Sequence, residues 1–441
     1  MKALARLIAV FAFICLSIPA MARDWYVSAE RGSGKTGTKE KPAADLGSII
    51  SQLQPGDVVY IAEGVYTGKG DSGVDIINVP VELYGGWSSD FSVRDPWGKH
   101  RTIFTGVNKT KNWVSGARIE FDLSKYRDTT ITPIVVDGFI IDQGPQNRYK
   151  DASELMIVRT ADPKTGSNPT PDRGGIFIRV SQPMASGKNW EIRVKNNVVL
   201  NSAPTQGVIA VFSYAESKVE IANNAVINCT GVGIYAGTSW RGSEEKRAPR
   251  YDIHNNTVMF IWKYDAYVQS FSGVGFMTDV EVVASLNENI FAFCDRFNVQ
   301  LNGKWPLLLK NNIFAGAVDS TYYEAVSDMK IDLTDIYDDS EYIHADSDGN
   351  IAGPLKVLAS KAWLEKYGQR ILIDRNAVEA DMQAQATRAN EIRSMLGLPA
   401  RADSIKADSP IWLHRMSIDD ALSIASANPA PGKGASSPVF P

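Results

Sequence analysis

The chain has 441 residues, of which 44% are hydrophobic and 22% are charged, with 35 glycines and 3 cysteines. These values are ordinary for a globular chain and exclude collagen-like, disordered and disulfide-rich classes. Forty-six basic residues against 50 acidic ones give a formal net charge of -4. The chain therefore has no basic field that would hold a phosphate backbone, and we expect no nucleic-acid partner.

The first 22 residues are predicted to be a signal peptide. Lys2 and Arg6 precede an apolar run over 7–18, and a small-x-small cleavage site follows over 20–22. The apolar run is shorter than the roughly 20 residues that a membrane-spanning helix needs. We therefore predict cleavage before Arg23, no membrane span, and export to the periplasm, the cell surface or the medium.

Removal of the signal peptide leaves two cysteines, Cys229 and Cys294, which is too few for a disulfide framework. Both lie in apolar, strand-like runs, over 226–229 and 291–294. We favour two buried free thiols, and a single bridge between them is the alternative.

The middle of the chain contains an irregular repeat. Four segments, over 192–198, 219–225, 251–257 and 307–313, share an alternating apolar pattern followed by Asn-Asn, and 286–290 is a degenerate copy. The second Asn of each copy is Asn197, Asn224, Asn256, Asn289 and Asn312. Variable steps between these residues suit the coils of a solenoid with loops of different lengths.

One period reads as a strand, an Asn-Asn corner, a strand over 225–229, a tight turn, a strand over 232–236 and a polar loop over 237–250. Three strands per coil result. Asn tolerates left-handed backbone angles at a corner. We therefore predict that the Asn side chains stack and hydrogen-bond from coil to coil, which is a structural role.

These features resemble secreted right-handed parallel β-helix proteins, the group that includes the pectate-lyase-like fold. Family-like phrases support the resemblance: Trp-Tyr-Val-Ser at 25–28, a capping helix over 46–53, a first coil over 55–66, and the runs at 83–87, 90–96 and 136–141. The resemblance covers roughly 24–317. It implies an all-β solenoid with an N-terminal capping segment, and it leaves the activity open because the group mixes lyases, hydrolases, epimerases and adhesins.

Beyond residue 317 the pattern changes. Residues 318–350 are rich in Asp and Tyr, and 355–367 and 377–396 read as amphipathic helices. The predicted division is a signal peptide over 1–22, the β-helix with its cap over 23–317, a helical C-terminal region over 318–427 and a flexible tail over 428–441. We expect the helical region to cover the open end of the solenoid. A dimer through that region is the alternative, and the oligomeric state stays open.

The loops that follow the second strand of each coil are the predicted functional site. They bring charged and aromatic side chains to one face, a composition that suits an anionic polysaccharide. For β-elimination, Lys263 or Arg296 would act as the base, and Arg179 would hold the uronate carboxylate. The possible Ca²⁺ ligands are Asp172, Asp265 and Asp295. The predicted substrate-binding residues are Arg173, Tyr235, Trp262, Tyr264, Tyr267 and Gln269, and strand alternation places Phe177, Asn298 and Gln300 on the same exposed face.

One further function stays open, and hydrolysis is less favoured because the Gly-His-Gly and Arg-Ile-Lys signatures of polygalacturonases, which share the resembled fold, are not found in the sequence. A non-catalytic surface or matrix protein would use the same face for glycan or protein contact. A hydrolase would need a carboxylate pair, for which Asp265 and Asp295 are the candidates. Convergence of Lys263, Arg296 and Arg179 on one sugar would favour a lyase, whereas dispersal would favour binding. The run Asp346-Ser347-Asp348-Gly349-Asn350 resembles part of a Ca²⁺ loop but lacks its terminal glutamate.

Overall fold

A computed structural model describes residues 22–68, 73–106, 116–127, 133–145, 155–157, 174–185, 188–202, 204, 207–263, 273–353, 355, 357–368, 379–401, 411–426 and 432–440. Residues 1–21 of the predicted signal peptide lie outside the described residues. Within them, the chain winds through three nine-stranded sheets. Within these three sheets the described strands pair in parallel except at the antiparallel pair β26–β27, so the predicted parallel β-helix is confirmed.

Sheet A contains β1 (Asp24–Val27), β2 (Val58–Ala62), β5 (Glu82–Trp87), β8 (Ile134–Asp137), β12 (Glu191–Lys195), β15 (Lys218–Ala222), β18 (Arg250–His254), β21 (Val283–Asn287) and β24 (Leu308–Lys310). Sheet B contains β3 (Gly64–Tyr66), β6 (Thr102–Phe104), β9 (Ile140–Asp142), β13 (Val198–Leu200), β16 (Ala225–Thr230), β19 (Thr257–Trp262), β22 (Ile290–Cys294), β25 (Ile313–Ala317) and β28 (Ile351–Ala352). Sheet C contains β4 (Asp75–Ile77), β7 (Ala117–Leu123), β11 (Gly174–Val180), β14 (Gly207–Ser213), β17 (Val232–Thr238), β20 (Val274–Thr278), β23 (Phe297–Leu301), β26 (Ser320–Glu324) and β27 (Met329–Ile331).

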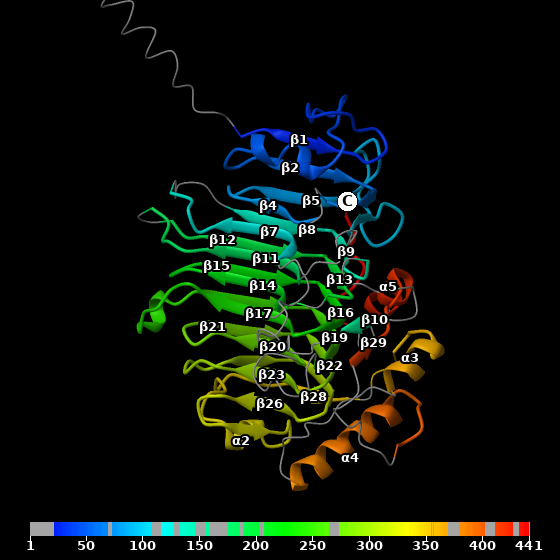
Figure 1. The fold of residues 1–441 in the computed structure, drawn as a ribbon. Coiled ribbons are helices and arrows are strands. Elements are labelled where there is room, and N and C mark those ends of the chain that lie inside the picture. Colours follow the sequence, from blue (N-terminus) through cyan, green and yellow to red (C-terminus); the bar gives the residue numbers. More distant parts are fainter. Residues whose placement is uncertain are drawn as a thin grey trace, which may run out of the picture.

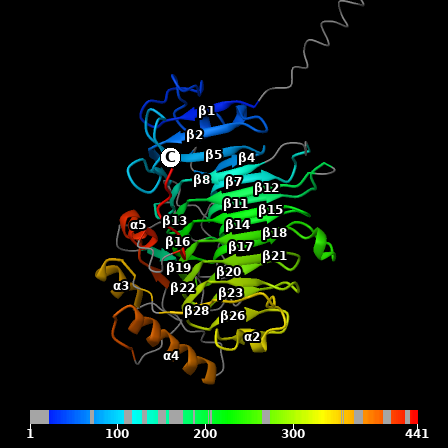
Figure 2. The ribbon, with the colours of Figure 1, turned by 180° about the vertical axis from the view of Figure 1, so that it is seen from behind.

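From β2 to β26 each coil supplies one strand to sheet A, then one to sheet B, then one to sheet C, and the coils stack along one axis (Figures 1 and 2). The solenoid therefore extends through Glu324, slightly beyond the predicted end at residue 317. At its N-terminal end the predicted capping helix is two short 3-10 turns, η1 (Leu46–Ser48) and η2 (Ile50–Gln52).

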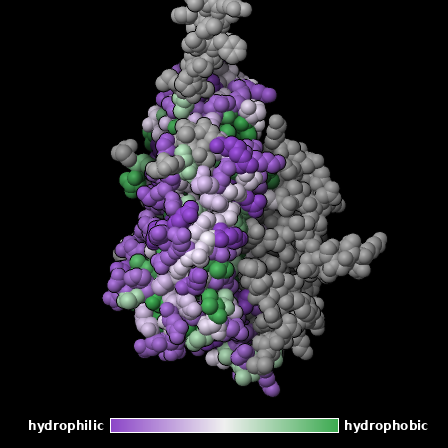
Figure 3. Space-filling model, turned by 90° about the vertical axis from the view of Figure 1, so that its left-hand side faces the viewer, coloured by the Kyte–Doolittle hydropathy of each residue, from purple (hydrophilic) through white to green (hydrophobic). Residues whose placement is uncertain are grey.

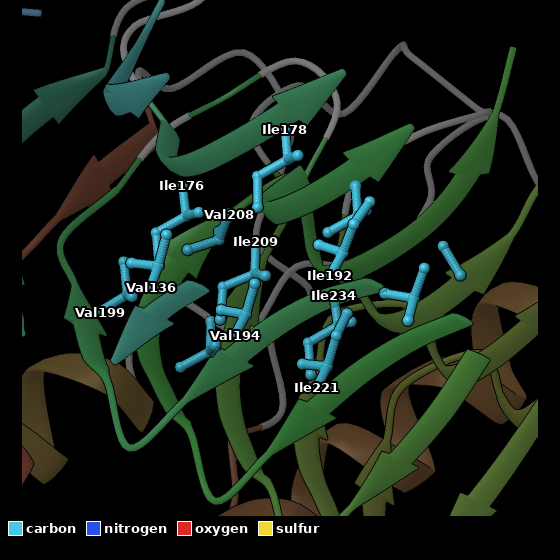
Figure 4. Close-up of a cluster of buried hydrophobic side chains, with 14 of the residues drawn as sticks. Val136, Ile176, Ile178, Ile192, Val194, Val199, Val208, Ile209, Ile221 and Ile234 are labelled. Atoms are coloured by element: carbon cyan, nitrogen blue, oxygen red, sulfur yellow. The ribbon is translucent and has the colours of Figure 1, made fainter. Parts of the chain in front are cut away.

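The interior of the solenoid is filled by aliphatic side chains that stack from coil to coil. Ile176, Ile209 and Ile234 occupy equivalent positions on successive strands of sheet C. They face Val194 and Ile221 of sheet A across the core (Figure 4). All five are fully buried. Burial of this kind contributes about 1.5–3 kcal/mol for each such side chain, and the stacking repeats it in every coil.

The predicted Asn ladder is confirmed at the corner between sheets A and B. Each second Asn donates its side-chain amide to the next one: Asn197 to Asn224 at 2.9 Å, Asn224 to Asn256 at 3.0 Å, Asn256 to Asn289 at 2.9 Å and Asn289 to Asn312 at 3.0 Å. Asn312 then donates to Asn350 at 2.9 Å, so the ladder has a further member that the repeat pattern did not reveal.

The left-handed corner conformation belongs to the residue before each ladder Asn. Asn196, Asn223, Asn255 and Asn311 have φ between 53° and 58°, and Glu288 has the same conformation in the degenerate copy. A polar side chain that can bond locally adopts this conformation at low cost. The two Asn of each repeat therefore have separate roles. The first adopts the left-handed backbone conformation at the corner, and the buried side chain of the second forms hydrogen bonds between neighbouring coils.

The C-terminal region lies along the side of sheet B rather than over the open end alone, which corrects the predicted cap. It contains α2 (Ile336–Asp339), α3 (Lys361–Gly368), α4 (Glu379–Met395) and α5 (Ile418–Ser426). Helix α4 contacts β25 near the end of the solenoid, and α5 contacts β13 and β16 (Figures 1 and 2). A short antiparallel pair joins β10 (Leu155–Ile157) to β29 (Ile411–Leu413).

An aromatic contact explains why the C-terminal region lies on sheet B. Phe260 and Phe293 have φ of 59° and 57° in the middle of their strands. Their rings stack on each other outside the solenoid at 5.1 Å between centroids. Trp363 and Tyr367 of α3 pack edge-on against Phe260 at 4.8 and 4.6 Å. Strands β19 and β22 therefore present an aromatic surface on the outer face of sheet B, and α3 packs on it.

The two cysteines are free and buried, as predicted. Cys229 and Cys294 lie at equivalent positions of β16 and β22, with Ile261 of β19 between them. Two strand spacings separate them by about 9.6 Å, which is beyond the reach of a disulfide. None of the described helices has the length and hydropathy that a membrane-spanning helix would require.

Candidate functional site

The corner between sheets B and C brings together three of the predicted site residues. Asp295 is 2% exposed and accepts a hydrogen bond from the backbone N–H of Lys263 at 2.8 Å. Lys263 is also 2% exposed, and Arg296 is 8% exposed. The Arg296 guanidinium lies 4.6 Å from the centre of the Phe297 ring and 3.6 Å from the Asp319 carboxylate. Two cations and two carboxylates thus share a buried corner.

Burial determines the ionisation of Asp295. Desolvation raises its pKa to about 7, although the Lys263 N–H and the Lys263 charge both act in the opposite direction. A carboxyl group that titrates near neutrality beside two cations can give or accept a proton at physiological pH. It is a poor match for Ca²⁺, because that ion prefers fully ionised carboxylates. Asp295 therefore fits a proton-transfer role better than the predicted metal-ligand role.

We expect Asp295→Asn to change how stability depends on pH. The folded state holds the Asp295 proton up to about pH 7, whereas the unfolded state releases it near pH 4. The folded state therefore binds more protons between these values, and wild-type stability falls as pH rises through them. The variant lacks this contribution, so it should gain stability relative to wild type from pH 4 to pH 8. Urea unfolding across that range measures the difference, and parallel profiles would contradict the assigned pKa.

Arg179 lies on the outer face of sheet C, away from the corner. The row Phe177, Ala210, Tyr235, Met277, Gln300 and Tyr323 runs across this face in register. Arg179 stands beside the row, with its guanidinium 5.1 Å from the Phe177 ring centre. It is three coils from Lys263, or about 14 Å along the axis. The two side chains therefore do not converge on one sugar, which is the arrangement that favours binding over β-elimination.

Three other predicted positions are more buried than strand alternation suggests. Trp262 is 1% exposed, donates its indole N–H to Asn228 at 2.8 Å and packs edge-on against Tyr367. In this conformation it is a core residue and cannot stack on a sugar. Tyr235 is 8% exposed and packs edge-on against Phe212. Asn298 is 1% exposed, because Phe297 takes the outer position and stacks on Tyr323.

Six predicted site residues lie outside the described part of the chain. They are Asp172, Arg173, Tyr264, Asp265, Tyr267 and Gln269. The described residues contain no group of three or more His, Cys, Asp or Glu that could hold a metal ion. Two residues of the Ca²⁺-like run near residue 348 have structural contacts: the Ser347 hydroxyl accepts the Leu309 N–H at 3.0 Å, and Asn350 extends the Asn ladder.

An open groove lies on the outer face of sheet A, where we had predicted no site. Its volume is about 970 Å³, within the range of ligand-binding clefts. The floor is a row of outward residues from five coils, and loop residues stand beside it. The residues that line the groove are Glu191, Ile192, Arg193, Lys218, Val219, Glu220, Glu245, Arg250, Tyr251, Asp252, Val283, Ala284, Ser285, Pro306, Leu308 and His344. The side of the molecule on which β12, β15 and β21 lie is mostly hydrophilic (Figure 3).

Two cations face each other across adjacent strands in this groove. Lys218 and Arg250 are register partners on β15 and β18, and both are exposed. On its other side Lys218 has Glu191 of β12 as its register partner; Glu191 also pairs with Arg193 at 2.9 Å, and Glu220 pairs with Lys195 at 3.0 Å. Glu245 and Asp252 line the groove as well. Like charges directly opposite each other on a sheet are destabilising. An anionic group bound between Lys218 and Arg250 would offset this repulsion.

Glu220 is held ionised beside the cation pair. A hydrogen bond from His254 and the pairing with Lys195 lower its pKa to about 2. The same contact raises the pKa of His254. The groove therefore has fixed positive and negative positions at neutral pH, with apolar surface from Val283 and Leu308 on the strands beyond Arg250. A strand pattern that alternates charge on one face, as in 191–195 and 218–222, was the available sequence signal.

No protein-family model and no curated protein matches the chain. Solved structures that resemble it include XylC in complex with xylose, at 12% identity and a TM-score of 0.30 over 68% of this chain and 63% of that one. Pectate lyase Pel9A matches at 11% identity and 0.32 over 69% and 70%, and a rhamnogalacturonan lyase at 11% and 0.21 over 76% and 87%. The chain thus spans less than two thirds of XylC. These scores are too low to carry an argument about activity, and the class, a parallel β-helix protein, rests on the strand pairing.

Proposed function

We propose that this chain is an exported β-helix protein that binds an acidic, uronate-bearing polysaccharide along the sheet A groove. The observation that carries the proposal is the register pair of two exposed cations, Lys218 and Arg250, in an open groove of about 970 Å³. Arginine and lysine both bind carboxylates through charge-assisted hydrogen bonds. Coils repeat every 4.8 Å or so, close to the length of one sugar residue, so an extended chain along the axis meets similar positions in successive coils.

Binding to a panel of acidic and neutral glycans tests this function. Pectate, alginate, hyaluronan and chondroitin oligosaccharides should bind, and dextran should not. Lys218→Gln and Arg250→Gln should each weaken binding about tenfold, in line with loss of one charged hydrogen bond, and added salt should weaken it further. Lys361→Gln removes the same charge from an exposed side chain on α3, away from the groove, and serves as the control. Equal affinity of all variants, measured by titration calorimetry, would show that the polysaccharide does not bind in the groove.

Cleavage by β-elimination is a second candidate, and the cluster of Lys263, Asp295 and Arg296 favours it. In this version Asp295 or Lys263 moves the proton, and Arg296 stabilises charge on the uronate. Appearance of the ultraviolet absorbance of an unsaturated uronate, assayed with Ca²⁺ and with chelator, would establish a lyase and test the calcium requirement. Loss of that signal in Arg296→Ala, with glycan binding retained, would separate the corner from the groove. No signal across the panel leaves the non-catalytic binder.

A further inference from the structure

The last residues of the described chain form a strap along the corner between sheets A and B, which corrects the predicted flexible tail. Residues 432–440 run from the level of β21 back toward the N-terminal coils (Figure 1). Phe440 ends the strap against Arg94, whose guanidinium lies 4.2 Å from its ring centre. The Pro, Gly and Ser composition suggested mobility, but the strap has specific partners on four coils.

The corner recognises the strap mainly through its backbone. Asn223 forms a two-way pair with Ser436: its side-chain amide donates to the Ser436 carbonyl at 2.9 Å and accepts the Ser436 N–H at 2.7 Å. Asn255 donates to the carbonyl of Gly432 at 3.1 Å. Asn223 and Asn255 are each the first Asn of their repeat copy. The corner therefore presents one side-chain amide to the strap in each of these two successive coils.

Two positions of the strap accept only small residues. Gly434 donates its N–H to the Glu288 carbonyl at 2.7 Å, and a Cβ at Gly434 would lie 2.5 Å from a methyl group of Ile290. Its φ of 74° also favours glycine. Ala435 is 1% exposed and donates its N–H to the Thr257 hydroxyl at 2.9 Å. The space beside Ile290 and Thr257 therefore fits a Gly-Ala dipeptide and excludes larger side chains.

We infer that the A–B corner is an acceptor groove for an extended peptide with a Gly-Ala centre, occupied here by the chain's own strap, and that it takes the same segment from a second copy when its own is released. The recognition is independent of the glycan site, because Asn223, Asn255 and Thr257 do not line the sheet A groove. A tethered strap has an effective concentration near the millimolar range, so it keeps the groove closed to other segments.

A synthetic peptide of residues 430–441, representing the strap of a second copy, tests the inference on the full-length chain. Gly434→Val should release the chain's own strap, because valine clashes with Ile290 and disfavours positive φ. The labelled peptide should bind this variant at least about tenfold more tightly than wild type, where the tethered strap competes. Circular dichroism checks that the variant is folded, and a chain that ends at residue 431 provides a second acceptor.

Matched controls separate recognition from general loosening. Gly432→Asn keeps a residue that tolerates positive φ, and no atom lies within 4 Å of a Cβ there, so this variant should behave as wild type. A peptide that carries Gly434→Val should not bind either acceptor. The inference is overturned if the wild-type peptide fails to bind both folded acceptors, or if the wild-type and Gly434→Val peptides bind equally.

Discussion

Arg118→Met should destabilise the N-terminal coils by about 3–5 kcal/mol, the cost of leaving a buried carboxylate without its cation. Arg118 is fully buried and donates to Asp75 at 2.5 Å, to the Thr105 carbonyl at 2.7 Å and to the Tyr66 carbonyl at 3.0 Å. It therefore ties together three segments of the first coils. Hydrogen exchange of the amides in β4 to β8 measures the local free energy of unfolding.

Two controls make this prediction specific. Arg193→Met removes an arginine from an exposed ion pair with Glu191 and should change stability by no more than about 1 kcal/mol. The double variant Arg118→Met, Asp75→Leu removes both charges and should recover much of the loss, because no unpaired charge is left. A single variant as stable as wild type would show that the pair contributes nothing to the fold.

Asn256→Ala should cost about 3–5 kcal/mol, since it leaves at least two buried groups without a partner at about 1–3 kcal/mol each. The side-chain oxygen of Asn256 accepts the backbone N–H of Asn224 at 2.9 Å, and its side-chain amide donates to the Ile221 backbone carbonyl at 2.8 Å. The side chain is fully buried, so water cannot replace these bonds. The loss should interrupt the ladder between the coils on its two sides.

The neighbouring residue provides the control. Asn255→Gly preserves the left-handed conformation at φ 53° and removes only partly exposed contacts, so the change should stay within about 1 kcal/mol. Chemical denaturation of both variants tests the pair. Similar losses for the two positions would contradict the division of roles between the turning Asn and the bonding Asn.

The repeat made the fold predictable. In the repeat copies, alternating apolar residues followed by Asn-Asn specify the strand, the corner between sheets A and B and the ladder locally, so these coils could be predicted from their own sequence. The bulged aromatic surface of Phe260 and Phe293 could not be read in this way. Its partners, Trp363 and Tyr367, lie far away in the sequence on α3, and only the folded chain brings them together.

The candidate site was harder to predict, because strand alternation gives the side of a residue and not its depth. Trp262 and Tyr235 lie in the predicted strands, yet both are buried against other aromatic rings. The structure brings Asp295 into contact with the backbone of Lys263, because consecutive coils place their turns in one column. The sheet A groove was missed, since its strand charges are spread over β12, β15 and β18, each with only a short alternating charge pattern.

Photocrosslinking with an acidic oligosaccharide is the most direct test of the proposed function. A photoreactive oligogalacturonate bound to the mature protein, followed by peptide mass spectrometry, reports which surface contacts the sugar. The account predicts labels on strands β12, β15 and β18, reduced in Lys218→Gln and Arg250→Gln and competed by unlabelled ligand. Labels confined to the corner of Lys263 and Arg296, or to no surface at all, would contradict it.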